Sequence, residues 1–270
     1  MAQRIAWDAL PGQLKDAIAA RTGPITTAQT MTAGLNSALA AVLETAAGRV
    51  FVKGLPSDHR RVITQDREAA VAPLVAGISP AMLWHFDEAG WNVLGYQYAP
   101  GRHAEYRPGS PDLDRIVWLM EALGRVEVPA DPGPLKRAED RWKTWVADPG
   151  DALAFAGPAL THTDWAPDNV LIAPDRPWLI DWAWSTLGAA WIDPACWLLR
   201  LMGAGGHSAE SAEQQAARVA AFAAADSAHV DPFAYANVRM WGEIAESSPA
   251  DWTEKMAQAA RDWHAYRLAR

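Results

Sequence analysis

The stretch THTDWAPDNVLI, residues 161 to 172, crowds polar side chains directly in front of an apolar run. His162 and Asp164 are followed, after four intervening residues, by Asn169, and Asp181 closes the next apolar run. A carboxylate can take a proton from a hydroxyl, and carboxylate and amide oxygens are the ligands that Mg²⁺ prefers. The stretch therefore predicts a loop that carries a base and metal ligands beside a rigid hairpin.

The spacing H-x-D-x-x-x-x-N with a later aspartate matches the template for phosphoryl transfer. In that template the first aspartate orients and deprotonates the attacking hydroxyl, while the asparagine and the second aspartate hold magnesium. The alternative is an ordinary turn at APDN with His162 as a satisfied loop histidine, since Asp and Asn are common in turns. Asp168 itself is interpreted as a turn-forming residue and not as a metal ligand.

A lysine and a glutamate in the first hundred residues supply the other half of the template. Lys53 lies in the alternating run RVFVKGL, which predicts a strand, and Glu68 follows fifteen residues later in a helical segment. A strand lysine that contacts phosphates and a helix glutamate that holds it recur in protein kinases. Five residues of the right type, in the right order, favour phosphoryl transfer over the turn interpretation.

The segment AGLNSALAAV, residues 33–42, occupies the phosphate-loop position but lacks G-x-G-x-x-G. Gly34 can adopt positive φ, and Asn36, Ser37 and backbone amides can donate to phosphate oxygens. An ordinary hairpin turn is the alternative for Asn36. We assign Ser37 to the predicted nucleotide site.

Residues 1–98 predict a small α+β unit. Helices are expected over residues 8–21 and 60–78, and strands over residues 25–33, 37–45, 49–55, 81–86 and 91–98. The Pro- and Gly-rich segment 99–112 predicts a hinge between lobes 1–98 and 99–270. The second lobe is expected to be mostly helical, with helices at 111–126, 134–147, 190–204, 208–226, 232–246 and 251–269 and a hairpin within 160–184.

Charge and composition exclude several classes of partner. The net charge is −8, and residues 1–100 carry eight basic and eight acidic side chains, so the whole excess lies in residues 101–270. Nucleic acid is an unfavourable partner, because binding it requires a basic face. No apolar run has bilayer-spanning length and no secretory signal is expected, so we predict a cytoplasmic protein without a membrane partner. The single cysteine, Cys196, fits a reducing compartment.

The chain resembles the aminoglycoside phosphotransferase family of small-molecule kinases over nearly its full length. THTDWAPDNVLI is similar to the family's catalytic loop, WLIDWAW (178–184) to its metal-binding segment, and IDPACWLL (192–199) to the aspartate-proline stretch that follows. The resemblance implies a two-lobed, protein-kinase-like α+β fold. Its first lobe would be a small antiparallel sheet with one main helix, and its second lobe mostly helical.

The resemblance also implies a role for each matching residue. Asp164 would be the catalytic base, and Asn169 and Asp181 would complete the catalytic set as the magnesium ligands. Lys53 would bind nucleotide phosphate with Glu68 as its partner, and GYQYAPG (95–101) would be the hinge, with the Gln97 and Tyr98 backbone at the adenine edge. The implied cofactors are ATP, with GTP as an alternative, and Mg²⁺.

Two departures from the family pattern stand out. Thr163 occupies a position where the family usually has glycine, and Trp182-Ala183 follows Asp181 in place of the Phe-Gly of protein kinases. The second departure favours a small-molecule acceptor. We expect Asp193 to cap a helix and to bond the catalytic loop, with a third metal ligand as the alternative; Trp165 belongs either to the core or to the acceptor site.

The sequence thus predicts an ATP-dependent phosphotransferase that acts on a hydroxyl of a small molecule. Residues 151–250 hold twelve acidic and four basic side chains, which favours a cationic acceptor such as an aminoglycoside antibiotic and hence resistance. The alternative for this charge is a solubilising acidic surface around a neutral pocket. The alternatives are a metabolic kinase for an amino alcohol or sugar, and a nucleotide-binding regulator without catalysis. The protein is expected to be a monomer or a homodimer.

Overall fold

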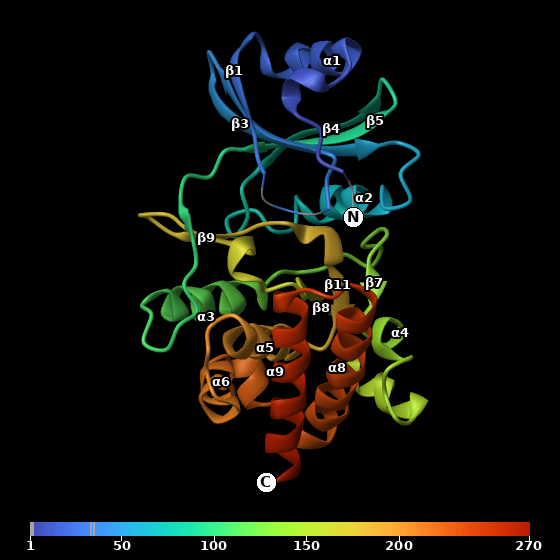
Figure 1. The fold of residues 1–270 in the computed structure, drawn as a ribbon, viewed down its shortest axis with the longest axis vertical. Helices are drawn as coiled ribbons and strands as arrows, with labels where there is room; N and C mark the ends of the chain where they lie inside the picture. The colour runs from blue at the N-terminus through green and yellow to red at the C-terminus, as the bar shows by residue number, and fades with distance from the viewer. Residues whose placement is uncertain (1–2, 33, 35) are drawn as a thin grey trace. The chain divides into compact units, whose positions relative to one another are not determined.

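The computed structural model describes residues 3–32, 34 and 36–270, which form two compact units, Met1–Pro100 and Gly101–Arg270 (Figure 1). The division falls within segment 99–112, close to the boundary expected from composition. The first unit is built on an antiparallel sheet and the second is mostly helical, so the predicted α+β class is confirmed. Within the described residues, no helix combines the length and the apolar character that crossing a bilayer demands.

A five-stranded antiparallel sheet organises the first unit in the order β1-β2-β3-β5-β4. The strands are β1 (Ile25–Thr30), β2 (Leu39–Thr45), β3 (Gly48–Pro56), β4 (Met82–Glu88) and β5 (Trp91–Gln97). The helical segments are η1 (Trp7–Ala9), α1 (Gly12–Thr22) and α2 (Ile63–Val71). The β4–β5 hairpin turns at Ala89 and Gly90, which both have positive φ, as a two-residue type I′ turn requires.

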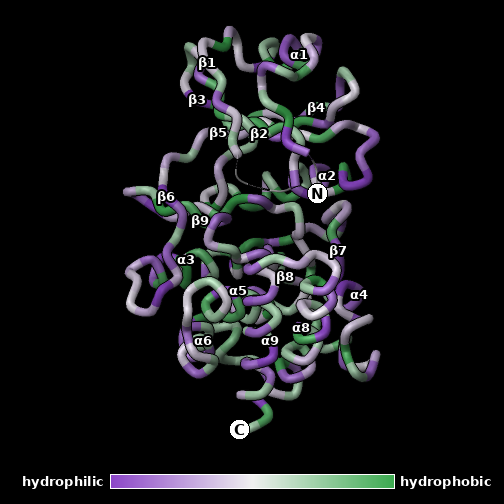
Figure 2. Tube along the Cα trace, in the orientation of Figure 1, coloured by the Kyte–Doolittle hydropathy of each residue, from purple (hydrophilic) through white to green (hydrophobic). Residues whose placement is uncertain are grey.

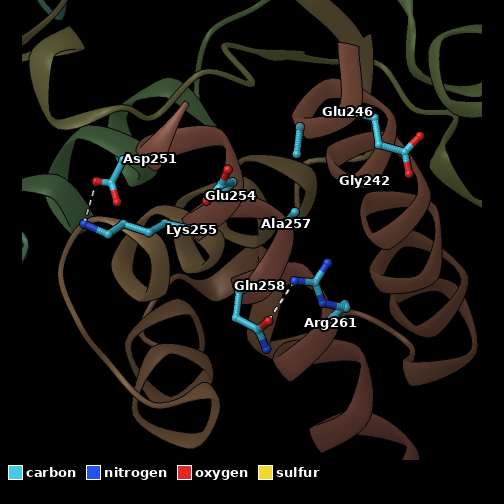
Figure 3. A pocket seen from close by; sticks show the side chains of 9 residues that line it. Gly242, Glu246, Asp251, Glu254, Lys255, Ala257, Gln258 and Arg261 are labelled. Carbon is cyan, nitrogen blue, oxygen red and sulfur yellow. Dashed lines mark hydrogen bonds and ion pairs between the residues drawn. The ribbon is translucent and has the colours of Figure 1, made fainter. Parts of the chain in front are cut away.

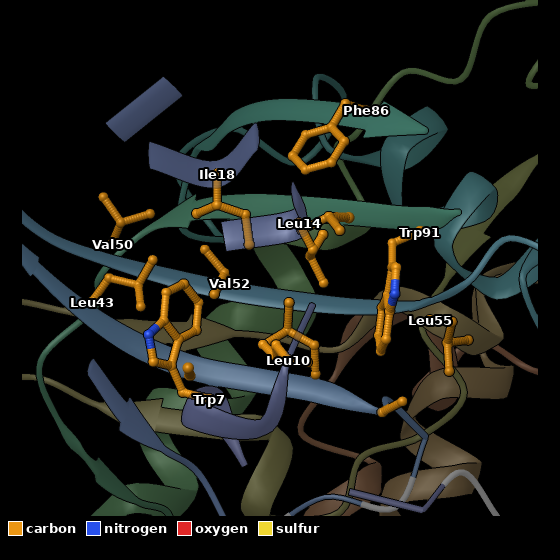
Figure 4. Packing of buried hydrophobic residues seen from close by; sticks show 14 residues of the cluster. Trp7, Leu10, Leu14, Ile18, Leu43, Val50, Val52, Leu55, Phe86 and Trp91 are labelled. Carbon is orange, nitrogen blue, oxygen red and sulfur yellow. The ribbon is translucent and has the colours of Figure 1, made fainter. Parts of the chain in front are cut away.

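The N-terminal segment covers one face of this sheet (Figure 4). Leu14 and Ile18 are one helical turn apart on α1 and are both fully buried in the cluster. Val50 and Val52 of β3 belong to the same cluster. Because side chains alternate along a strand, Lys53 then points to the opposite face. The apolar core thus sets the direction of the predicted phosphate-binding lysine.

The second unit combines helices with two small sheets. The helices are α3 (Asp112–Leu123), α4 (Ala138–Trp142), α5 (Ile192–Gly203), α6 (Ala209–Ala216), α7 (Ala220–Ala223), α8 (Ser227–Ser247) and α9 (Asp251–Leu268), with 3₁₀ turns η2 (Pro149–Phe155), η3 (Pro167–Asn169) and η4 (Trp182–Trp184). One sheet has the order β10-β9-β6 and the other β7-β11-β8. Their strands are β6 (Arg102–His103), β7 (Lys136–Arg137), β8 (Ala159–Thr161), β9 (Val170–Ile172), β10 (Pro177–Leu179) and β11 (Thr186–Gly188).

Helix α5 forms the buried centre of the helical unit, and its hydropathy can be followed in Figure 2. Leu198, Leu199 and Leu201 are buried along it, and Trp197 is fully enclosed. Buried apolar residues lie on more than one face of α5, as is expected of a helix that is surrounded by other elements. A charged residue on such a helix therefore needs a specific partner.

Three predicted helices differ from the structure. The segment 134–147 contains only the short α4, because Lys136 and Arg137 pair in parallel with β11, a long-range contact that local propensity cannot reveal. The segment 208–226 breaks at Val219, which adopts an extended backbone and buries its side chain. Helix α8 begins five residues before the predicted 232, because Asp226 accepts a hydrogen bond from the Ala228 amide as its N-cap.

Candidate active site

The predicted catalytic loop lies between β8 and β9 of the second unit. β8 ends at Thr161 and β9 begins at Val170, so the loop turns through residues 162–169 and η3. Asp164 keeps 24% of its side chain exposed, whereas His162 is fully buried. The loop therefore presents the predicted base and encloses the histidine beside it.

His162 ties the loop to the segment that carries Asp181. Its Nε2 lies 3.0 Å from Ile180 O, and its Nδ1 accepts the Asp164 amide at 3.3 Å, so Nε2 carries the ring proton. The ring packs edge-on against Trp165 and Trp182, with centroids 5.9 and 4.7 Å away. His162 is a supporting residue with no free ring nitrogen.

Asp193 anchors the catalytic loop by accepting hydrogen bonds from two of its backbone amides. Its Oδ2 accepts from His162 N at 2.9 Å and its Oδ1 from Thr163 N at 2.7 Å. Burial raises the pKa of this carboxyl, against the lowering effect of the amide hydrogen bonds. The expected bond to the catalytic loop is present, and both carboxylate oxygens are engaged in it. The expected helix cap is wrong: α5 begins at Ile192 with Trp191 as its N-cap, and Asp193 lies in its first turn.

Thr163 shows why glycine is the usual residue at its position. Its φ is +66°, a left-handed conformation that a β-branched residue rarely adopts. The hydroxyl compensates: it donates to Trp184 O at 3.0 Å and accepts from Arg141 Nη1 at 2.6 Å. Arg141 also donates to Trp184 O and Thr186 Oγ1, so α4 clamps the catalytic loop to the loop after Asp181.

Strand pairing brings Asn169 and Asp181 to the same end of one hairpin. Val170 pairs with Leu179, and the next amide along, Ile180 N, donates to Asn169 O at 2.9 Å. Asp181 follows with φ +67° and ψ +68°, another left-handed residue without glycine's freedom. Such strain persists only where the surroundings impose it, and it gathers at functional sites.

The side-chain oxygen atoms at this end of the hairpin are of the type that binds magnesium. Asn169 Nδ2 donates to Asp164 O at 2.9 Å, so its Oδ1 is the amide atom left to bind a metal. One amide oxygen and one carboxylate are a typical protein share for Mg²⁺, which takes its other ligands from phosphates and water. The described residues contain no group of three or more His, Cys, Asp or Glu that could hold a metal by itself.

In the first unit, Lys53 and Glu68 form a buried ion pair. Lys53 Nζ lies 2.6 Å from Glu68 Oε2, with the two side chains 9% and 4% exposed. Tyr96 adds a hydrogen bond from its hydroxyl to the same carboxylate at 3.3 Å. The pair joins β3 to α2, so the ammonium is held in one position.

The remaining nucleotide-site residues lie at the ends of strands. Ser37 lies just before β2 and is partly buried; two other residues of segment 33–42, Ala33 and Leu35, lie outside the described residues. Gln97 ends β5, and its amide donates to Ala81 O at 2.8 Å. Tyr98 follows β5, with its ring 5.4 Å from the Arg49 guanidinium.

Sequence comparison alone finds no relative: no family model matches the chain. No curated protein matches it either. The fold is more informative.

Solved structures resemble the chain over almost its whole length. The choline kinase LicA from Streptococcus pneumoniae has a TM-score of 0.64 at 14% identity, covering 94% of this chain and 98% of its own. A putative aminoglycoside phosphotransferase from Ralstonia eutropha has a TM-score of 0.61 at 12% identity, with 96% and 98% covered. The macrolide 2'-phosphotransferase MphH from Brachybacterium faecium has 0.56 at 21% identity, with 93% and 98% covered.

The chain has the protein-kinase-like fold of the aminoglycoside phosphotransferases and choline kinases. The resemblance inferred from THTDWAPDNVLI is thus confirmed at the level of the fold. Two further neighbours were solved with nucleotides: LicA with AMP, and the aminoglycoside phosphotransferase APH(4)-Ia with AMP-PNP and hygromycin B.

Sequence reasoning missed the partner of Asp164 in this kinase-like fold. Arg200 Nη2 donates to Asp164 Oδ1 at 2.7 Å from helix α5. A lone arginine in the apolar run IDPACWLLRLMG was the available signal, since a buried charge requires a partner. Arg141 was missed as well, because the segment around it was read only as a helix.

A hollow of about 560 Å³ lies between α8 and α9 (Figure 3). Its lining is mixed in charge, with Asp251 paired to Lys255 at 2.8 Å and Arg261 bonded to Gln258 at 2.7 Å. None of the predicted site residues lines it. Because it contains none of these residues, we do not assign it to the predicted phosphoryl-transfer site.

Proposed function

We propose that the protein is an ATP-dependent phosphotransferase that moves the γ-phosphoryl group of a nucleotide to a hydroxyl of a small molecule. The hairpin that brings Asn169 and Asp181 together beside Asp164 carries the proposal, in a fold that solved small-molecule kinases share. The buried Lys53–Glu68 pair supports it independently from the first unit.

Each residue has a role in the proposed reaction. Asp164 takes the proton of the acceptor hydroxyl, whose oxygen forms a bond to the γ-phosphorus. The bond from that phosphorus to the β–γ bridging oxygen breaks, and its electron pair leaves with ADP. Lys53 contacts the phosphates, and Glu68 holds it there.

Asn169 Oδ1 and the Asp181 carboxylate would hold Mg²⁺. When bound, the ion would neutralise charge on the β- and γ-phosphates. We assign Ser37 to the phosphates, and the backbone of Gln97 and Tyr98 to the adenine edge. GTP is an alternative donor, because backbone contacts at the purine edge do not by themselves select the base.

The acceptor class is a finer part of the proposal. A cationic antibiotic such as an aminoglycoside is supported by the acidic excess of residues 151–250 and by hygromycin B in the complex of APH(4)-Ia. Part of that excess is already neutralised, since Asp175, Glu213 and Asp231 all form ion pairs with arginines. A metabolic kinase for an amino alcohol or sugar is the alternative, and LicA is a choline kinase.

A catalytically silent regulator is less favoured, because Lys53, Asp164, Asn169 and Asp181 are all present. We also propose a cytoplasmic location, which the single buried cysteine favours. Burial raises the pKa of the Cys196 thiol, which keeps it protonated and unreactive.

The test is an ATP-consumption screen against hydroxylated metabolites and antibiotics, with product masses and an Asp164→Asn control. The expected result is a product heavier by one phosphoryl group, formed by the wild type and strongly reduced in the variant. ATP turnover at equal rates in both proteins would contradict the proposal, and so would a complete lack of Mg-ATP binding by the wild type.

A further inference from the structure

Arg200 forms an ion pair with one oxygen of Asp164, the proposed catalytic carboxylate. Arg200 Nη2 lies 2.7 Å from Asp164 Oδ1, and the two side chains are only 15% and 24% exposed. Within the described residues, no other side chain donates to that carboxylate. Its Oδ2 is therefore the atom left for an acceptor hydroxyl, and whatever binds there meets the guanidinium.

Two tryptophans hold this guanidinium. The Arg200 Cζ lies 5.3 Å from the ring centroid of Trp241 on α8 and 5.9 Å from that of Trp252 on α9. The two indoles are in edge-to-face contact, with centroids 6.0 Å apart. Cation–π contacts from two rings and an ion pair fix the guanidinium, so an approaching acceptor would have to accommodate it.

The guanidinium has hydrogen-bond capacity left. It carries five N–H donors, of which one bonds Asp164, and no further hydrogen bond joins it to the described residues. Guanidinium donors lie in a plane that matches the oxygens of a carboxylate or a phosphate. An oxygen-bearing group of the acceptor would satisfy these donors, whereas an ammonium group has no acceptor atom and would be repelled.

We propose that Arg200 is an acceptor-binding residue and that the acceptor carries a carboxylate or similar oxyanion close to the hydroxyl that is phosphorylated. This inference rests on the proposed function and names the substrate class. It differs from the cationic expectation at this point of the site. The acidic excess of residues 151–250 is a count along the sequence that includes buried acids such as Asp193 and Glu213, whereas Arg200 is the charge that contacts the proposed base.

A positioning role for Arg200 makes a different prediction. If the arginine only orients Asp164, its loss would weaken turnover of every acceptor equally. If it binds the acceptor, its loss would affect oxyanion-bearing compounds most. Matched compounds therefore separate the two roles.

The test measures binding of acid, neutral and amine forms of the same hydroxylated skeleton, of which gluconate, sorbitol and glucamine form one set and glycerate, glycerol and 3-aminopropane-1,2-diol another. Melting temperature and calorimetric affinity are recorded with Mg-AMP-PNP present, for the wild type, Arg200→Met and Arg200→Lys. Arg218→Met is the matched control, because Arg218 pairs with the exposed Asp114 on the surface.

We expect an acid to stabilise the wild type and the Arg218→Met control, and to bind about tenfold or more weakly to Arg200→Met. Arg200→Lys should recover part of this affinity, because it restores the charge but not the planar donors. The amine of each set should stabilise the wild type less than the acid does.

Three outcomes would overturn the inference: tighter binding of amines than of acids, equal loss for all three forms in Arg200→Met, or no acid that stabilises the wild type. Mg-AMP-PNP affinity is measured in the same samples. Its absence in the wild type would count against the kinase proposal itself, whereas normal nucleotide binding with no dependence on Arg200 would remove only this inference.

Discussion

Arg141 Nη1 donates a hydrogen bond to Thr163 Oγ1 at 2.6 Å, and Thr163 holds a φ of +66° next to the proposed base. The arginine comes from α4, and the same nitrogen also bonds Trp184 O and Thr186 Oγ1. The hydroxyl of Thr163 thus supplies hydrogen bonds that offset a strained backbone. A glycine at this position would relieve the strain but lose the clamp.

This balance predicts a difference between two substitutions. Thr163→Gly loses two hydrogen bonds but relaxes the backbone, so its free energy of unfolding should change little. Thr163→Val keeps the branched Cβ at positive φ and leaves Arg141 short of an acceptor, so it should be less stable by about 1–3 kcal/mol. Urea unfolding measures both, and a valine variant as stable as the wild type would disprove the compensation.

Asp164→Asn should lower the turnover number by about a hundredfold to ten-thousandfold, the usual share of a general base, and leave nucleotide affinity almost unchanged. The physical reason is that, in the proposed reaction, Asp164 deprotonates the acceptor and contacts no phosphate. Steady-state kinetics and calorimetry separate these effects. Asp168→Asn, in η3 of the same loop, is the control; if it were the inactive variant, the base would be Asp168.

Asp181→Ala should abolish the magnesium dependence of nucleotide binding, because it removes a charged ligand of the ion. Titration calorimetry with ATP, with and without Mg²⁺, measures this. Asp175→Ala is a matched control on the same hairpin, since Asp175 lies on the exposed turn and pairs with Arg176. Equal Mg-ATP affinity in wild type and Asp181→Ala would refute the assigned ligand.

Lys53→Met should destabilise the first unit as well as weaken nucleotide binding. Without the ammonium, Glu68 is a buried carboxylate whose main counter-charge is gone, which costs about 3–5 kcal/mol. The double variant Lys53→Met/Glu68→Gln should regain most of the stability but not the nucleotide affinity. Denaturant unfolding measures the stability, and calorimetry measures the nucleotide affinity. A double variant as unstable as Lys53→Met would contradict the stabilising role of the Lys53–Glu68 ion pair.

His207 should make the stability of the second unit depend on pH. Burial lowers its pKa from the ordinary value, despite hydrogen bonds that raise it, such as that to Tyr106 O at 2.9 Å. Because the unfolded chain then binds a proton more readily than the native one, stability is complete above about pH 6.5 and is lost as the pH falls towards the native pKa.

The His207→Gln variant checks this directly, since its amide nitrogen can replace Nε2 as a donor. As the pH is lowered from 7.5 to 5.5, its melting temperature should fall less steeply than that of the wild type. The melting temperatures of the two proteins are also compared at pH 8, where a lower value for the variant would report a loss of packing. Parallel pH profiles in the two proteins would exclude His207 as the titrating group.

The sequence by itself predicted the parts of this protein that arise from local order. Strand β3 follows from alternation, β2 and β5 follow from strand-like runs bounded by turn residues, and the β9–β10 hairpin follows from two short apolar runs around Asp175. Asn169 and Asp181 could be placed together for the same reason, because a hairpin joins residues that are near in sequence. The kinase-like fold follows from that motif together with Lys53 and Glu68.

Only the tertiary structure revealed which distant side chains meet. Arg200 reaches Asp164 across 36 positions, and Arg141 reaches Thr163 across 22. The break at Val219 and the pairing of Lys136 with Thr186 have the same origin. Sequence periodicity reports which face of an element is apolar, but a partner is selected by how separate elements pack, and that packing depends on the whole unit.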